Sequence, residues 1–309
     1  MLQPVKFINR YTLETETETI PHEKGLRLLY EFPVGGTLSL YLAVKRLWFS
    51  SWYGRLKKSS LSKNEISKFV ETYGLDPSEF EKQMNTFENF NDFFVRRLKA
   101  QSRPIRMGEE NAVFPCDGRH SVFQSLSEIE GVFVKGQFLD LGGLLEDQAL
   151  AETYQNGSMV ISRLAPQDYH RFHFPIDCTA SSSKLIHGDL YSVNPIALRK
   201  NINYLVQNKR RVTRLKTDIW GEVLMLEIGA TFVGSIKQTY SPDTQIRKGA
   251  EKGYFEIGGS MIILLFEPGR ITFSPDLVSA MEKGMELYAR CGDLLGTIRK
   301  PSEGNRCPI

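Results

Sequence analysis

The sequence is poor in the residues that build metal sites and disulfide frameworks. Its 309 residues include four cysteines and five histidines. The cysteines lie far apart and form no CxxC pair, so neither a structural zinc site nor a disulfide scaffold is predicted. The closest histidines, His170 and His173, are three residues apart, whereas the histidines of a helical HExxH zinc site are four apart. We therefore expect no bound metal.

Long apolar runs and a strong charge of either sign are also missing. The longest apolar run, residues 261–266, is far shorter than the roughly 18 residues that a membrane-spanning helix needs. Residues 1–24 contain no apolar core of a signal peptide, so none is expected. The net charge of +3 is too small to indicate nucleic-acid binding, and we predict no nucleic-acid partner.

One stretch combines aromatic residues with basic charge. Residues 36–58 place leucines and aromatic residues at helical spacing, and they include five basic residues and no acidic one. This combination is typical of a helix that lies on an anionic membrane surface. An ordinary helix that packs on the core and turns a basic face to water has the same pattern. The residues alone leave these two interpretations equally weighted.

Periodicity separates a helical part of the chain from a strand-rich part. Helical spacing predicts helices within 62–84, over 90–98 and at about 142–155. After residue 105, short segments rich in Val, Ile and Phe alternate with Gly, Pro, Asp and Asn, which is typical of strands and turns. We therefore predict an α+β fold, in which a largely helical N-terminal region precedes a mostly antiparallel β domain.

Two glycines interrupt what otherwise looks like one apolar strand. The segment GYFEIGGSMIILLF, residues 253–266, contains Gly258 and Gly259 directly before Ser260. Glycine weakens a strand interior, but it permits unusual dihedral angles and close backbone approach. If this serine acted as a nucleophile, the carbonyl of the preceding residue would be the nearest electrophile. The motif alone is weak, since it lacks the GxSxG pattern of serine hydrolases.

The residue types that activate a serine occur elsewhere in the chain. A serine hydroxyl needs a base, and a carboxylate can orient an imidazole base. Asp117 lies in the turn PCDG, where an aspartate usually bonds its own backbone. His170 and His173 lie in DYHRFHFP and would point to opposite sides of an extended segment, so we expect them to have different roles. A histidine that is simply hydrogen-bonded in the core is the plainer interpretation of each.

Several ordered motifs together resemble one family. They run over most of the chain in the family's order, and they are FNDFFVRRL (90–98), PCDG (115–118), DYHRFHFP (168–175), IGATFVGSI (228–236) and KGAEKGYFEIGGS (248–260). On these motifs the chain is identified as similar to the phosphatidylserine decarboxylases, in their bacterial, pyruvoyl-dependent and self-processing form. The cysteine in PCDG stands where alanine is frequent in the family, and this difference does not affect Asp117.

The resemblance implies a site. Asp117, His173 and Ser260 would form the charge relay of self-cleavage between Gly259 and Ser260. His170 would act at the substrate, by phosphate contact or proton transfer. Ser260 would attack the Gly259 carbonyl, and its residue would become a covalent pyruvoyl group. A substrate amine would form a Schiff base with that group, which would accept the electron pair released with carbon dioxide.

The resemblance also implies an organisation and a location. Residues 1–85 would form a membrane-associating region and residues 86–309 the catalytic domain. Cleavage would give a β chain (1–259) and an α chain (260–309), which together form a heterodimer from one precursor. The enzyme would convert phosphatidylserine to phosphatidylethanolamine in phospholipid biosynthesis. It would bind an anionic lipid surface peripherally, on the cytoplasmic side of the cell membrane, and this favours the membrane interpretation of residues 36–58.

Three other functions remain compatible with the residues. A pyruvoyl-dependent decarboxylase of a soluble amino-acid derivative would share the Gly-Ser chemistry without binding membranes. A serine hydrolase would stay uncleaved and react with an organophosphonate. An inactive membrane-binding module would stay uncleaved and show no activity.

Overall fold

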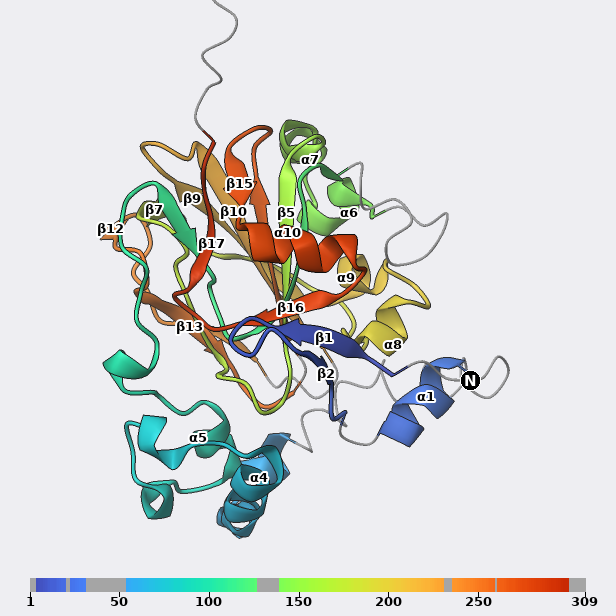
Figure 1. Cartoon of the computed structure of the whole chain (residues 1–309), viewed down its shortest axis with the longest axis vertical. Coiled ribbons are helices and arrows are strands. Elements are labelled where there is room, and N and C mark those ends of the chain that lie inside the picture. Colours follow the sequence, from blue (N-terminus) through green and yellow to red (C-terminus); the bar gives the residue numbers. More distant parts are fainter. Residues whose placement is uncertain are drawn as a thin grey trace, which may run out of the picture.

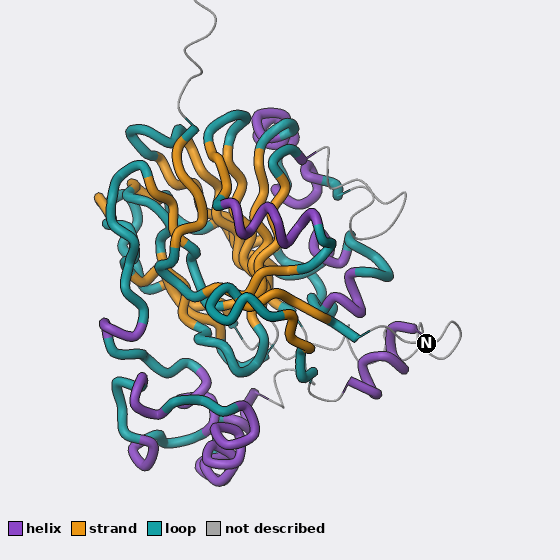
Figure 2. The backbone as a smooth tube through the Cα atoms, in the orientation of Figure 1, coloured by secondary structure: helices purple, strands orange, loops and turns teal. Residues whose placement is uncertain are grey.

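The protein is built around one large sheet with helices at its periphery (Figures 1 and 2). The structure, a computed structural model, describes residues 4–20, 23–31, 54–126, 139–230, 235–258 and 260–299. Within these residues helices and strands are both present, so the predicted α+β class is confirmed. Among the short segments after residue 105 that are expected to be strands, GVFVKG at 131–136 lies outside the described part.

Eleven strands form the large sheet. Ten follow the order β12-β7-β9-β10-β14-β5-β4-β16-β1-β2, and β8 pairs with β9 beside this path. In sheet order, their bounds are Gln245–Ile246, Cys178–Ala180, Arg210–Lys216, Glu222–Gly229, Ser260–Phe266, Ser158–Leu164, Gly118–Phe123, Glu286–Ala289, Lys6–Asn9 and Thr15–Thr17, with β8 at Lys184–Ile186. The sheet is mixed rather than purely antiparallel, because β1 runs parallel to β16.

Two sheets of three strands accompany the large one. The first has the order β11-β13-β6 and the second β15-β17-β3. Their bounds, in that order, are Ile236–Gln238, Glu251–Phe255, Arg171–His173, Ile271–Phe273, Leu294–Ile298 and Asn111–Val113. The segment expected to be one interrupted strand is therefore two strands, β13 and β14, which belong to different sheets.

The central strand β14 shows that the large sheet is covered on both faces. Every residue of its sequence SMIILLF is buried, as is usual for a strand covered on both sides. Alternate side chains point to opposite faces. Ile262, Leu264 and Phe266 enter one core, which the small sheets and α10 complete. Met261, Ile263 and Leu265 enter a second core, which α6 to α9 cover. The sheet thus forms the middle of a layered structure.

The helices are short. Their bounds are Glu23–Glu31 (α1), Glu65–Tyr73 (α4), Phe90–Phe94 (α5), Leu141–Leu145 (α6), Gln148–Tyr154 (α7), Pro195–Leu198 (α8), Tyr204–Gln207 (α9) and Pro275–Glu282 (α10). The prediction of a single helix at 142–155 was wrong. Glu146 adopts a left-handed conformation with φ of 48°, and Asp147 then caps a new helix through the backbone N–H of Leu150.

A small aromatic cluster joins α4 and α5, which lie together below the sheet in Figure 1. Its buried members are Ile66, Phe80, Phe87, Phe90, Phe93, Phe94 and Ile257. By residue type, Asn89 and Asn91 are both candidates for the N-cap of α5, and the cap is Asn89, whose side chain accepts a hydrogen bond from Asp92 N. The helix ends at Phe94, earlier than the predicted residue 98, and α4 ends at the left-handed Gly74.

The N-terminal region is only partly helical. Its strands β1 and β2 extend the large sheet, whereas α1 and α4 are helical. Most of the basic aromatic stretch at 36–58 lies outside the described residues, so the predicted membrane-associating helix is not confirmed. Within the described residues, no helix has both the length and the apolar character to cross a bilayer.

Candidate active site

The chain changes sheets directly before Ser260. The strand β13 ends at Phe255 in a small sheet, and β14 begins at Ser260 between β10 and β5 of the large sheet. Gly258 has φ of 143°, which non-glycine residues rarely adopt. Gly259 lies outside the described residues. The predicted scissile bond thus falls where the chain passes between two separately held strands.

Ser260 is fully buried at this junction. Its Oγ has no hydrogen-bond partner among the residues that the structure describes. A buried hydroxyl without a partner costs about 1–3 kcal/mol of stability. Such a group calls for an explanation, and a nucleophile that awaits its base is one.

Strand register places Asp117 at the same end of the sheet. Ser260 lies opposite Leu164 of β5, and Arg119 of β4 lies opposite Arg163 of β5. If that ladder continues by one residue, Gly118 lies opposite Leu164. Two strand spacings of about 4.8 Å then separate the backbones of Ser260 and Gly118 by about 10 Å.

Asp117 is held by an arginine that sequence reasoning missed. Its carboxylate, 1% exposed, accepts bonds from Arg103 Nε at 2.9 Å and Nη2 at 2.6 Å, and from Cys291 N at 2.9 Å. Arg103 also bonds Glu79 at 3.2 Å. This guanidinium compensates a carboxylate that would otherwise be buried alone. No hydrogen bond joins Asp117 to His173 among the described residues.

His173 has other hydrogen-bond partners. Its Nδ1 bonds the carbonyl of Gly249 at 2.9 Å, which makes Nδ1 the donor and leaves Nε2 to accept from the Tyr169 hydroxyl at 3.2 Å. Burial lowers the pKa of His173, while the charges of Glu251 and Asp117 act in the opposite direction. Asp117 therefore influences His173 through space, and the direct relay between them stays a prediction.

His170 is a neutral, fully buried imidazole. Its Nδ1 donates to the carbonyl of Asp168 at 2.9 Å, and its ring lies 3.9 Å from the ring of Phe94. Its Nε2 is buried and has no partner among the described residues. Burial, helped by the charge of Arg96, lowers its pKa to about 3. At neutral pH His170 thus offers one unshared lone pair, in a tautomer fixed by the backbone.

The two histidines differ as strand alternation suggested. They belong to the segment around β6, which pairs with β13, the strand that leads to the junction. His173 lies opposite Glu251, and the carbonyl of His170 accepts a bond from Phe255 N. The two imidazoles contact different groups, so they are suited to different roles.

Arg96 is a second buried cation that the sequence did not single out. Its Nη2 donates to the carbonyls of Gln167 at 2.9 Å and Asp168 at 3.3 Å, next to His170. The guanidinium lies over the rings of Phe80 and Phe93 at 5.3 and 4.9 Å. Burial lowers its pKa to about 10. The RR dipeptide in FNDFFVRRL gave no signal that its first arginine turns inward.

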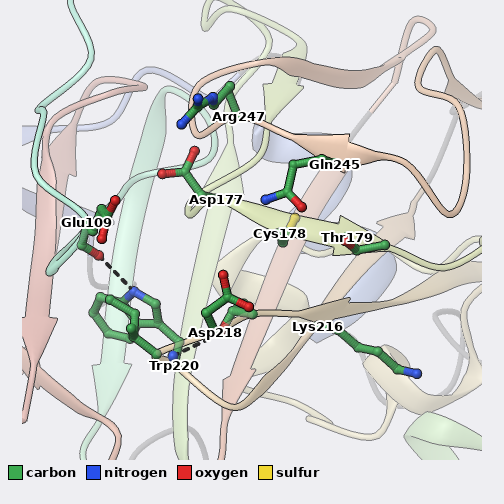
Figure 3. A pocket seen from close by; sticks show the side chains of 11 residues that line it. Glu109, Asp177, Cys178, Thr179, Lys216, Asp218, Trp220, Gln245 and Arg247 are labelled. Carbon is green, nitrogen blue, oxygen red and sulfur yellow. Dashed lines mark hydrogen bonds between the residues drawn. The ribbon is translucent and has the colours of Figure 1, made fainter.

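The pocket in Figure 3 is separate from the candidate active site. It lies beside β7, β12 and the turn after β9, and its lining includes acidic residues such as Asp177 and Asp218 and basic ones such as Lys216 and Arg247. None of the four predicted site residues lines it. No group of three or more metal-ligating side chains occurs among the residues described by the structure.

Comparison with known proteins identifies the family. Residues 90–296 match the family model "Phosphatidylserine decarboxylase". A phosphatidylserine decarboxylase proenzyme of Chlamydia felis is 43% identical over 295 residues, which cover 96% of this chain and 98% of that protein. Proenzymes of the same name from Fusobacterium nucleatum and Clostridium perfringens are each 40% identical, over 95% and 94% of this chain and 98% and 99% of theirs. The chain belongs to the phosphatidylserine decarboxylase family.

Proposed function

We propose that this chain is a self-processing proenzyme that decarboxylates phosphatidylserine to phosphatidylethanolamine. The single observation that carries the proposal is the buried, unpartnered Oγ of Ser260 at the start of β14, directly after a Gly-Gly break. The near-full-length similarity to proteins named proenzymes supports the same conclusion.

Self-cleavage needs a proton to leave Ser260 as its Oγ attacks the Gly259 carbonyl. His173 is our candidate base, because its neutral Nε2 carries a lone pair that only the Tyr169 hydroxyl shares. Asp117 would stabilise the imidazolium that forms. The attack makes an ester and frees the backbone amine, and elimination of the ester then separates residues 1–259 from 260–309. Water then adds to the new N-terminal residue and displaces its nitrogen as ammonia, and the residue becomes the pyruvoyl group.

The surroundings of Ser260 fit the formation of such a group, since its Oγ has no competing hydrogen bond among the described residues and leaves with the Gly259 carboxylate after the elimination. Once formed, the pyruvoyl group supplies an electron sink for the pair released with carbon dioxide. The chain then has to deliver a proton to the decarboxylated carbon. We assign this step, or contact with the substrate phosphate, to His170, whose Nδ1 is held by the backbone. Its open Nε2 would first take up a proton, because only the protonated nitrogen can donate to the carbon or to a phosphate oxygen.

The intact mass of the purified protein tests the proposal. We expect two chains that end at Gly259 and begin at residue 260, the smaller with a blocked N-terminus. Ser260→Ala should remain one chain and lose all decarboxylase activity. A wild-type protein that stays whole, or a Ser260→Ala variant that still splits there, would refute it.

We further propose that the N-terminal region, residues 1–85, docks on anionic membranes ahead of a catalytic domain at 86–309. Supporting this, Leu56 and Leu61 are 44% and 78% exposed, and basic side chains such as Arg55 and Lys63 are exposed next to them. The double variant Leu56→Ser/Leu61→Ser should sediment less with anionic vesicles than the wild type does. The equally exposed Met107 supplies the control, since Met107→Ser should sediment normally.

A further inference from the structure

The segment before the junction is anchored by α5, outside the sheets. Ile257 N donates a hydrogen bond to the side-chain Oδ1 of Asn91 at 3.2 Å. The side chain of Ile257 is 6% exposed and belongs to the aromatic cluster. One residue thus receives both a backbone anchor and a side-chain anchor from the helical region, two positions before the predicted scissile bond.

Asn91 is itself held rigidly. It is 8% exposed and is the second residue of α5. The start of that helix is fixed twice, because Asn89 caps Asp92 N at 3.0 Å and the Ser62 hydroxyl accepts from Phe90 N at 3.0 Å. The amide oxygen of Asn91 therefore provides a fixed point for the chain that approaches the junction.

The two glycines make such a fixed point necessary. Ser260 is set by β14, but Gly258 and Gly259 have no side chains that could pack and restrict them. Attack requires the reacting atoms to come within about 3–3.5 Å, and a misplacement of about 1 Å can cost 10²-fold in rate. Holding Ile257 leaves only these glycines to adjust between two fixed ends.

We propose that Asn91 is a positioning residue for self-cleavage. Its Oδ1 fixes the backbone at Ile257, and this limits the paths open to the two glycines that follow, so that attack by Ser260 on the Gly259 carbonyl needs less reorganisation. Asn91 does not contact the reacting atoms and moves no proton. The proposal rests on the proposed self-processing function. It gives the helical region a role in maturation that is separate from membrane docking.

The test follows self-cleavage in a pulse of cell-free synthesis, with the two fragments quantified by mass. Asn91→Leu keeps the size of the side chain and removes the acceptor, and we expect it to cleave at least about tenfold more slowly. Asn91→Asp keeps an acceptor oxygen and should cleave at close to the wild-type rate. Asn194→Ala removes the same kind of bond at another helix, where Ile196 N donates to Asn194 Oδ1 at 3.0 Å, and this variant should also cleave normally.

Thermal midpoints of the same variants in a Ser260→Ala background separate positioning from loss of stability. Slow cleavage by Asn91→Leu alone, at a midpoint no lower than that of Asn194→Ala, supports the proposal. Wild-type cleavage by Asn91→Leu overturns it, and so does a rate that follows the midpoint in all three variants. If the wild type itself stays whole, the proposed function fails, and this result is distinct from the others.

Discussion

The two sides of the junction at Ser260 are held in opposite ways. Downstream, β14 pairs through its backbone with β10 and β5 along its full length, and its side chains fill two cores. Upstream, Ile257 depends on one side-chain hydrogen bond and a small aromatic cluster. The comparison teaches that the part that becomes the new chain end is fixed by the main fold, whereas Ile257, the last residue before the two glycines, is fixed by side chains. Stability and cleavage should therefore respond differently on the two sides.

The largest effect on stability is expected downstream. Ile263 is fully buried on β14, and Ile263→Ala removes core contacts on the central strand. Such a change costs about 2–5 kcal/mol in free energy of unfolding. Urea unfolding in a Ser260→Ala background measures it. The folded Ile263→Ala protein should still cleave at a near wild-type rate at low temperature. Slow cleavage there would show that stability and cleavage do not respond differently on the two sides of the junction.

The matched upstream change should affect the cleavage rate more, and the stability less, than the downstream change does. Ile257→Ala removes the same side chain from the aromatic cluster, and we expect about 2 kcal/mol, at the low end of the range for this kind of deletion. Self-cleavage should slow severalfold even at low temperature, because the segment loses its packing. Equal cleavage rates for the two isoleucine variants would show that the aromatic cluster does not position the junction.

The upstream side should also carry a pH dependence. Burial lowers the pKa of His170 from an ordinary 6.5 to about 3. Between these values the unfolded chain binds a proton that the folded chain does not bind. The free energy of unfolding therefore falls as pH falls below 6.5, by up to about 1.4 kcal/mol per pH unit from this group. In a Ser260→Ala background, urea midpoints between pH 7.5 and 5.5 should fall less steeply with His170→Gln than without it.

The smallest effect is expected at the surface of the same segment. Lys58 bonds Glu256 at 2.7 Å, but the lysine side chain is 49% exposed. Exposed ion pairs contribute about 0–1 kcal/mol. Lys58→Ala should thus change neither the urea midpoint nor the cleavage rate measurably. A clear loss of cleavage would show that this ion pair, rather than Asn91, positions the segment before the junction.

The fold could be predicted only as far as local patterns reach. Alternation and turn residues predicted strands after residue 105, and residue types left the cap of α5 open between Asn89 and Asn91. The break at Glu146 was missed because a left-handed glutamate leaves no mark in a helical pattern. The separation of β13 from β14 was missed for a different reason. Apolar alternation shows that a strand is buried, but it does not show which strands will be its neighbours.

The candidate site residues could be proposed from residue type, whereas their contacts could not. The motifs predicted Asp117, His170, His173 and Ser260, and the register brings Asp117 to the same end of the sheet as Ser260. Arg103 and Asn91 could not be predicted, because their partners lie 14 and 166 residues away along the chain. An arginine next to a proline and an asparagine at a helix start look like ordinary surface residues. Only the folded backbone shows what they hold.

The central position of β14 has a consequence for how the protein refolds after cleavage. The segment 260–299 lies within the fold, with β16 between β4 and β1 and β17 beside β3. Once the proposed cut is made, an unfolded molecule is two polypeptides, and recovery requires them to find each other in solution. Refolding then becomes bimolecular and depends on concentration. The mature enzyme would thus be a protein that assembles once, as a single chain, and is replaced after damage by new synthesis.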